Sequence, residues 1–254
     1  MNFSTFKDCL TKIKKFFFPT KYDLQQRNTH RARLLLYNQF IKPGDLCFDI
    51  GANYGNRTSV FLELGAKVVA LEPQANCIAY LNKKFANKAI FLQKGAGEKN
   101  EIKDFYVSEK YNELSSFSKN WLDTLKDRVG ETTFDKIEKI EIVTIDALIE
   151  EYGKPAFIKI DVEGFEDKVL TGLTKNFTYL SFEFAVPEML NNLITCLQII
   201  HHNYPLATYN FSVGEKSTIT NKTWATFTEM VALVNQKNFI TNYAGDIYVS
   251  NNYQ

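Results

Sequence analysis

Short apolar runs alternate with amphipathic stretches from residue 44 onward. The runs that predict strands cover residues 46–50, 66–71, 89–93, 156–160, 179–184, 207–213 and 246–249. Apolar residues at helical spacing predict helices at 56–64, 76–85, 164–173 and 187–202. The region 101–145 is less regular and holds two alternating stretches, 102–107 and 140–143. Strands that alternate with helices predict an α/β fold with a mostly parallel sheet covered on both faces.

The first 42 residues follow a different pattern. Apolar residues spaced by three and four positions form one helical stripe that Pro19 ends: Phe3, Phe6, Leu10, Ile13 and Phe17. A second helix is predicted over 22–41, with four apolar residues facing inward: Leu24, Leu34, Leu35 and Phe40. Pro43 and Gly44 break this helix. We therefore expect an N-terminal helical arm, residues 1–42, followed by one large domain, residues 43–254.

The arm is basic although the chain of 254 residues carries a net charge of only +1. It holds nine Lys and Arg against Asp8 and Asp23, a net charge of +7, which leaves −6 for the remainder. Two interpretations are open: residues 1–18 pack on the domain or its cleft, or they lie on an anionic membrane surface. An acidic body with one basic arm is not typical of a nucleic-acid-binding protein, so no nucleic-acid partner is expected.

Composition narrows the chemistry further. The four cysteines are far apart in the sequence, which argues against a zinc ribbon or a dithiol centre: Cys9, Cys47, Cys77 and Cys196. The chain has only three histidines, too few for histidine-rich metal sites. No apolar run is long enough to cross a membrane, and no signal peptide is evident. We expect a cytoplasmic protein, with peripheral membrane contact through residues 1–18 as the open alternative.

A glycine loop follows the first predicted strand. Its sequence runs from Asp49 through Gly51 and Asn53 to Gly55, at the carboxyl end of the strand, where ligands bind in open α/β sheets. The glycines permit close backbone approach, and Asn53 is the best non-glycine residue for a left-handed position. The spacing does not fit the dinucleotide pattern G-x-G-x-x-G.

Two acids sharpen the ligand prediction. Asp49 precedes Gly51 by two residues and would oppose a pyrophosphate, but it suits the ammonium group of S-adenosylmethionine. Glu72 follows the second strand, 21 residues after Gly51, where an acid is placed for a ribose diol. After the third strand, Gln93 and Gly95 are expected near the adenine. These residues favour S-adenosylmethionine over NAD as cofactor.

Here the sequence resembles the FkbM family of S-adenosylmethionine-dependent methyltransferases. The segments DIGANYGNRTS (49–59), VVALEP (68–73), IVTIDALI (142–149) and FIKIDVEGFEDKVLTG (157–172) carry the resemblance, which covers about 44–190. It implies a class I, Rossmann-like fold with seven strands, one of them antiparallel. It also implies methyl transfer, usually to oxygen, on acceptors that vary among small molecules, sugars and lipids.

The most specific of these segments supplies the expected catalytic residues. Asp161 is expected at the junction of cofactor and acceptor, and either Asp161 or Glu163 is the expected base. Lys159 precedes Asp161 by two residues, so both side chains point to one side of the strand, and the lysine can hold an acid ionised. Glu166 and Asp167 are expected to be ordinary acids of a first helical turn.

Other residues are expected on the acceptor side. Ser115 and Ser116 match a serine-rich segment of the family, and Phe165 stands where the family often has Ala. Glu183 is expected to line the acceptor pocket or to bond a backbone group. Asp161, Glu163 and Glu183 have the oxygen ligands that magnesium prefers, but without histidines we expect no metal.

Three classes of function were weighed. The favoured one is an S-adenosylmethionine-dependent O-methyltransferase that acts on a small-molecule, glycan or lipid-linked hydroxyl. The second is a non-catalytic protein that keeps the cofactor fold as a binding or regulatory module. The third, an NAD-dependent oxidoreductase, is disfavoured by Asp49 and by the missing third glycine.

Overall fold

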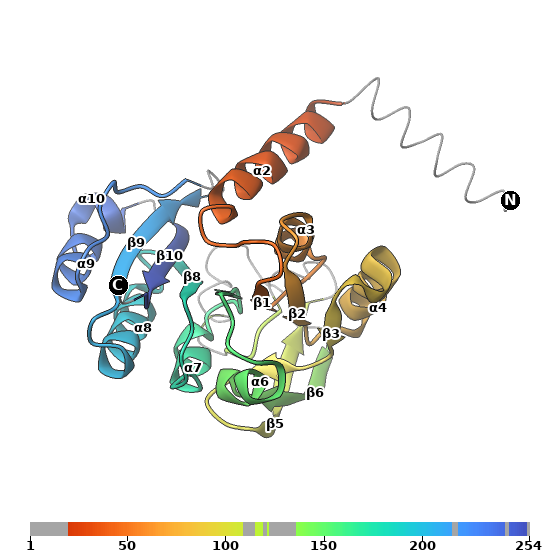
Figure 1. Cartoon of the computed structure of the whole chain (residues 1–254). Coiled ribbons are helices and arrows are strands. Elements are labelled where there is room, and N and C mark those ends of the chain that lie inside the picture. Colours follow the sequence, from red (N-terminus) through yellow and green to blue (C-terminus); the bar gives the residue numbers. More distant parts are fainter. Residues whose placement is uncertain are drawn as a thin grey trace, which may run out of the picture.

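The computed structural model describes residues 20–108, 115–118, 121, 136–214, 218–241 and 244–252. They build one seven-stranded sheet in the order β3-β2-β1-β7-β8-β10-β9 (Figure 1). Its strands are β1 (Leu46–Ile50), β2 (Lys67–Leu71), β3 (Ile90–Leu92), β7 (Phe157–Ile160), β8 (Tyr179–Ala185), β9 (Thr208–Val213) and β10 (Ala244–Ser250). In this sheet the strands β3, β2, β1, β7 and β8 are mutually parallel, and β10 runs antiparallel to both of its neighbours.

All seven strands predicted for this sheet are confirmed to within two residues at either end. The two alternating stretches, 102–107 and 140–143, are also strands, but they lie in a separate three-stranded sheet. It consists of β4 (Gly95–Ala96), β6 (Lys136–Val143) and β5 (Glu101–Val107) in that order. The short strand β4 was not predicted, because two residues give no periodicity to detect.

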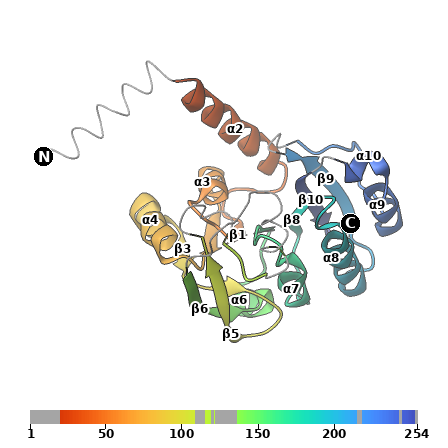
Figure 2. The same cartoon turned by 180° about the vertical axis from the view of Figure 1, so that it is seen from behind.

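Helices surround the central strands in both views (Figures 1 and 2). They are α2 (Lys21–Tyr37), α3 (Asn56–Glu63), α4 (Ala75–Phe85), α6 (Ile145–Tyr152), α7 (Glu166–Thr171), α8 (Leu190–Asn203), α9 (Phe227–Val234) and α10 (Lys237–Ile240), with a 3-10 turn η1 at Ala86–Lys88. The helices α6, α9 and α10 had not been predicted. Each is eight residues or fewer, which leaves little room for a helical period.

Two apolar clusters cover the two faces of the large sheet. Along β7, Phe157 belongs to the cluster with α2, α3 and α4, whereas Ile158 and Ile160 belong to the cluster with α6, α7, α8 and α9. Successive residues of a strand point to opposite faces, so Lys159 shares the face of Phe157. This alternation directs Lys159 into the layer beneath α2 and α3.

Helix α2 projects from the body and is anchored at its C-terminal end (Figures 1 and 2). Its N-terminus is closed by a capping box between Thr20 and Asp23. Tyr37 packs edge-to-face on Phe61 and Phe157, with ring centroids 5.0 and 5.3 Å apart. The C-terminal part of the predicted arm therefore packs in the same core as the sheet.

The inward face predicted for this helix was partly wrong. Leu24 and Leu35 are 46% and 67% exposed, whereas Arg33, Leu36 and Tyr37 are buried. The three-leucine run gave no unique stripe, and only the position of α3 decides which side is covered. The predicted stripe of residues 1–18 lies outside the described residues. Within the part of the chain that the structure describes, no helix is long and apolar enough to cross a membrane.

Candidate active site

A cavity of about 570 Å³ opens at the carboxyl ends of the parallel strands. It is lined by the glycine loop after β1, by Glu72 after β2, and by Asp161 and Glu163 after β7. Gly95 from β4 and Glu183 from β8 complete the wall toward the small sheet and toward β10. Residues from five strands or strand ends thus meet at the place where an open α/β sheet binds its ligand.

The glycine loop has the backbone that its sequence predicts. Gly51, Asn53 and Gly55 all have positive φ angles, of 82°, 47° and 75°. A Cβ on Gly51 would lie 1.8 Å from the carbonyl oxygen of Asp161, so this position requires glycine. The glycine loop therefore lies directly against Asp161, the first residue after β7, and this contact brings the two halves of the cavity together.

The amide groups of this loop are already engaged within the protein. The N–H groups of Gly51 and Ala52 donate to the Leu71 carbonyl at 2.9 Å, and that of Gly55 donates to Ala52 at 2.8 Å. The N–H of Asn53 donates to the Glu72 carboxylate at 2.8 Å. A pyrophosphate binds through such amides when they point outward. Here these four amides point inward, so the loop is not built for phosphate.

Asp49 is 1% exposed and lies where β1 meets the cavity. It accepts a hydrogen bond from the Thr58 hydroxyl on α3. Burial raises the pKa of Asp49, and the hydrogen bond from Thr58 and the charges of Arg57 and Lys159 partly offset this rise. An ammonium group in the cavity would further stabilise the ionised form.

Glu72 is held by two backbone donors at the end of β2. Its carboxylate accepts from the amides of Asn53 and Gln74, at 2.8 and 2.9 Å. Burial raises the pKa of Glu72 to about 7, although both backbone hydrogen bonds lower it. The carboxylate keeps lone pairs beyond those two bonds, so its position in the cavity wall suits a diol.

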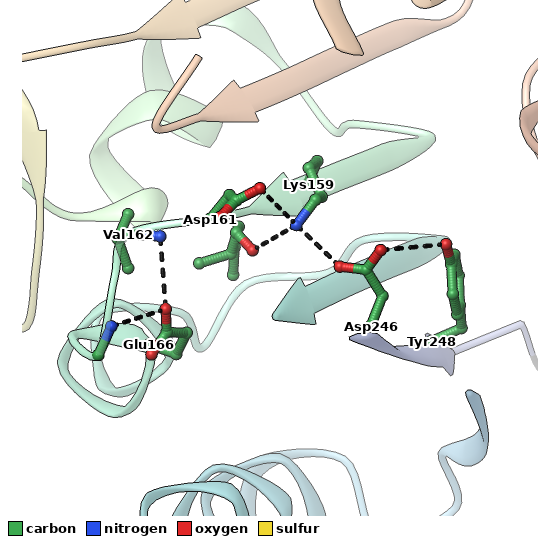
Figure 3. A network of polar contacts seen from close by, with 8 residues as sticks. Lys159, Asp161, Val162, Glu166, Asp246 and Tyr248 are labelled. Atoms are coloured by element: carbon green, nitrogen blue, oxygen red, sulfur yellow. Dashed lines mark hydrogen bonds and ion pairs between the residues drawn. The ribbon is translucent and has the colours of Figure 1, made fainter. Parts of the chain in front are cut away.

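Lys159 lies below the cavity floor in a network shown in Figure 3. Its ammonium group is 3.2 Å from Asp161, 2.9 Å from Asp246 and 3.0 Å from the Ile160 carbonyl. Burial lowers the pKa of Lys159, but the two carboxylates outweigh burial and leave it above its ordinary value. The predicted pairing of this lysine with an acid is confirmed, and the lysine stays charged.

Two of the three acids at the cavity floor have pKa values that are shifted in opposite directions. Burial raises the pKa of Asp161, but the charges of Lys159 and Arg57 and a hydrogen bond from Glu183 hold it below its usual range. Burial and the charges of Asp161 and Glu163 raise the pKa of Glu183 well above normal. The two pKa values are thus shifted in opposite directions, so Asp161 is the first of this pair to lose its proton.

These acids are also the cluster that a metal ion would need. Asp161, Glu163 and Glu183 each offer an oxygen, and these oxygens lie within 4.8 Å of one another. Lys159 already pairs with Asp161, and the raised pKa of Glu183 makes it a poorer anionic ligand than an ordinary glutamate. The absence of a metal remains a prediction.

Glu166 lies in the first turn of α7, as predicted, but it is not the ordinary first-turn acid that was expected. It is 3% exposed, and its carboxylate accepts from the amides of Val162 and Gly164, at 3.4 and 3.2 Å (Figure 3). Burial raises its pKa to about 7. Glu166 therefore folds the loop that carries Glu163, whose own φ is 52°. The second acid of the E-G-x-E spacing was the available signal, because it can reach back to the loop amides.

The remaining predicted residues divide into two groups. Ser115 lines the cavity, while Ser116 lies behind it and donates to the Glu163 carbonyl at 2.6 Å. Gln93 does not line the cavity, and its amide donates to the Pro73 carbonyl at 3.4 Å. Phe165 lies in the apolar core against Phe117 and lines a second cavity instead.

Four residues of the site were missed in the sequence. Asp246 completes the ion pair of Lys159 from the antiparallel strand, and Arg57, from the first turn of α3, influences Asp49 and Asp161. Gln74 lines the cavity beside Glu72, and Arg33 lines it from α2. Arg57 lies within the segment 49–59 and Gln74 directly follows 68–73, so both stood beside motifs, whereas tertiary packing alone brings Arg33 of α2 and Asp246 of β10 to the site.

The sheet order, the single antiparallel strand and the acidic crevice define a class I, Rossmann-like methyltransferase. A family model described as the methyltransferase FkbM domain matches residues 49–241. The chain belongs to this FkbM methyltransferase family, whose cofactor is S-adenosylmethionine. The nicotinamide-dependent alternative is therefore wrong.

Solved methyltransferase structures resemble this chain at low sequence identity. The plantazolicin methyltransferase BpumL in complex with SAH is 10% identical, with a TM-score of 0.43 over 94% of this chain and 93% of that chain. A TehB-like SAM-dependent methyltransferase from Corynebacterium glutamicum is 9% identical, with a TM-score of 0.44 over 90% and 96%. A search of curated proteins gives no match. The family assignment rests on the domain match.

The residues present fit this cofactor. The cavity is acidic along β1 and β2 and offers no outward amides from the four loop residues described above, as a phosphate-free cationic ligand requires. Asp49 would meet the amino-acid end of the cofactor, and Glu72 the ribose. When bound there, the cofactor supplies a methyl group activated by a sulfonium.

Proposed function

We propose that the protein transfers a methyl group to a hydroxyl oxygen of its acceptor. The observation that carries the proposal is the carboxylate of Asp161 at the cavity floor, which Lys159 holds at 3.2 Å and whose pKa is lowered, beside Glu183, whose pKa is raised. A carboxylate with a lowered pKa suits a neutral hydroxyl, which needs to be oriented and then to lose a proton. An amine acceptor would already be cationic at neutral pH and would first have to be deprotonated.

Asp161 has the leading role in this proposal. Its carboxylate accepts a hydrogen bond from the acceptor hydroxyl and aligns the oxygen lone pair with the methyl group. The low pKa of Asp161 makes it a weak base, but an alcohol oxygen that has gained a methyl group is a very strong acid. The proton therefore passes to Asp161 or Glu163 as the new carbon–oxygen bond forms.

Lys159 and Glu183 are positioning residues in this proposal. Lys159 fixes Asp161 and favours its ionised form. Asp246 is the second carboxylate that pairs with this lysine. Glu183 holds the other side of Asp161 through a hydrogen bond. Glu166 sets the loop that carries Glu163. The floor of the cavity is thus pre-organised before an acceptor arrives.

The alternative of a non-catalytic binding protein is separated by two measurements. Titration calorimetry with S-adenosylmethionine, S-adenosylhomocysteine and NADH is expected to show binding of the first two only. Transfer of a labelled methyl group is then assayed on sugars, uronic acids and phenols, each paired with its amine analogue. O-methylated products support the proposal, transfer only to nitrogen contradicts it, and cofactor binding without any transfer favours the alternative.

The acceptor itself is proposed only as a class: a small molecule, a glycan or a lipid-linked hydroxyl. The basic residues of the arm support a site near an anionic membrane surface for the lipid-linked case. Deleting residues 1–18 is expected to abolish sedimentation with anionic vesicles and to leave calorimetric binding of S-adenosylhomocysteine unchanged. Equal sedimentation of both proteins would remove the membrane proposal.

A further inference from the structure

The wall of the cavity that α2 contributes is not explained by cofactor binding. Arg33 is 8% exposed and lines the same cavity as Asp49 and Asp161, although it belongs to the helix before β1. It lies one turn before Tyr37, the residue that anchors α2 on α3 and β7. Its position is therefore fixed by the core rather than by surface contacts.

Three basic residues line the cavity among the described residues, and they are not equivalent. Lys94 forms an ion pair with Glu141 at 2.6 Å on the side of the small sheet. The charge of Arg57 lowers the pKa of both Asp49 and Asp161 and thereby stabilises the ionised forms of these two acids. Arg33 is the one charged residue that α2 brings to the cavity among the described residues.

The surroundings of Arg33 favour an incoming anion. The α2 sequence carries Lys21, Arg27, Arg31 and Arg33 against Asp23 alone, so the helix that brings Arg33 to the cavity is basic. A guanidinium has five donors in a planar fork that matches the geometry of a carboxylate or a phosphate. The acids Asp161 and Glu163 would repel such an anion from the floor, so it would be held at the α2 side.

We propose that Arg33 binds an anionic group of the acceptor, a carboxylate or a phosphate, and thereby selects an acidic acceptor. This rests on the proposed function, because it assumes that the acceptor hydroxyl reaches Asp161. The anionic group and the reacting hydroxyl would then belong to one molecule, held at two ends of the cavity. A uronic acid and a phosphorylated headgroup both satisfy this requirement.

The test uses the full chain saturated with S-adenosylhomocysteine at low ionic strength. Inorganic phosphate, D-glucuronate and neutral D-glucose are titrated separately, and binding is followed by saturation-transfer or ³¹P NMR. We expect phosphate or glucuronate to bind more tightly than glucose. The anion that binds distinguishes a phosphate-bearing acceptor from a carboxylate-bearing one. Equal binding of glucose and both anions, or no binding of either anion, would overturn the proposal.

Variants on one helix assign the effect to Arg33. Arg33→Gln is expected to weaken anion binding about tenfold or more, because it removes a charge-assisted contact. Arg31→Gln, an exposed arginine on the same helix, removes the same charge and is expected to change binding less than about twofold. An equal loss in both variants would mean that only the general field of α2 matters, which contradicts the proposal.

Binding of S-adenosylhomocysteine separates this inference from the proposed function. If the wild-type protein does not bind it, the proposed function fails and not the anion site alone. If Arg33→Gln loses it through misfolding, Arg33→Lys decides, since lysine keeps the charge but not the fork. Anion affinity in Arg33→Lys between those of wild type and the glucose baseline supports the proposal, and unchanged affinity contradicts it.

Discussion

The acids at the ends of β1 and β2 differ in kind from Asp161 at the end of β7. Asp49 and Glu72 are each held by neutral donors, a hydroxyl and two backbone amides, and burial raises both pKa values. Asp161 is held by a buried ammonium group and has a lowered pKa. Acids at neighbouring strand ends thus differ in the direction in which the protein shifts their pKa values.

This difference matches the two tasks of the cavity. The cofactor half needs hydrogen-bond acceptors for a cationic ligand. Buried acids are suitable there, because the bound cation offsets the effect of burial and stabilises their ionised form. The transfer half needs one fixed anion whose charge does not depend on what is bound. The buried Lys159 fixes such an anion. This arrangement removes three charged groups, Lys159, Asp161 and Asp246, from most of their contact with water.

The largest expected effect breaks the transfer half at its anchor. Lys159→Met removes the ammonium partner of the buried Asp246 and the partly buried Asp161, so the free energy of unfolding is expected to fall by about 3–5 kcal/mol. Urea unfolding measures this change. Lys139→Met removes the exposed ion pair with Asp104 and is expected to cost less than about 1 kcal/mol. Equal losses in the two variants would show that the Lys159 network does not stabilise the fold.

The next effect separates turnover from binding. Asp161→Asn removes the anion that orients the hydroxyl, and kcat is expected to fall about 10²–10⁴-fold. Calorimetry is expected to show a change below about threefold in affinity for S-adenosylhomocysteine, because Asp49 and Glu72 remain. Asp167→Asn is the neighbouring control, since Asp167 does not line this cavity. Full activity of Asp161→Asn on a true acceptor would remove Asp161 from catalysis.

A third effect concerns the loop that joins the two halves. The folded-state pKa of Glu166 is about 7 and its ordinary value is 4.5, so the native state binds more protons between these pH values. The free energy of unfolding should therefore fall as pH rises through this window, by up to about 3 kcal/mol from this residue.

Denaturant titrations at pH 5, 6 and 7.5 test this slope. Glu166→Gln can still accept from Val162 and Gly164 but does not titrate, so its unfolding free energy should fall less with pH than that of wild type. Asp167→Asn should keep the wild-type slope. Identical slopes in wild type and Glu166→Gln would contradict the raised pKa of this acid.

The smallest effect sharpens the cofactor half through its pH dependence. Burial raises the pKa of Glu72 to about 7, and the ribose diol should bind best to the ionised carboxylate. Affinity for S-adenosylhomocysteine is therefore expected to be about tenfold lower at pH 6 than at pH 8. Glu72→Gln should flatten this dependence, whereas exposed Glu150→Gln should not. A flat wild-type profile would show that Glu72 does not titrate in this range.

Motifs carried by one strand and its following loop were predictable. The Asp49 to Gly55 loop, Glu72, and the Lys159–Asp161 pair each depend on spacing along a single strand, where side-chain alternation and positive φ are local properties. Misplaced residues show the limit. Gln93 was assigned to the adenine from its position after β3, but its amide turns back to Pro73.

The tertiary structure decided the rest of the site. Asp246 is more than eighty residues from Lys159, and only the antiparallel insertion of β10 beside β8 brings them together. Arg33 belongs to the predicted arm, and only the packing of α2 on α3, through Tyr37, directs it toward the cavity. The sequence determined which strand ends carry chemistry, because that chemistry is written in local spacing. Which distant charges complete it depends on packing between elements, which no local pattern encodes.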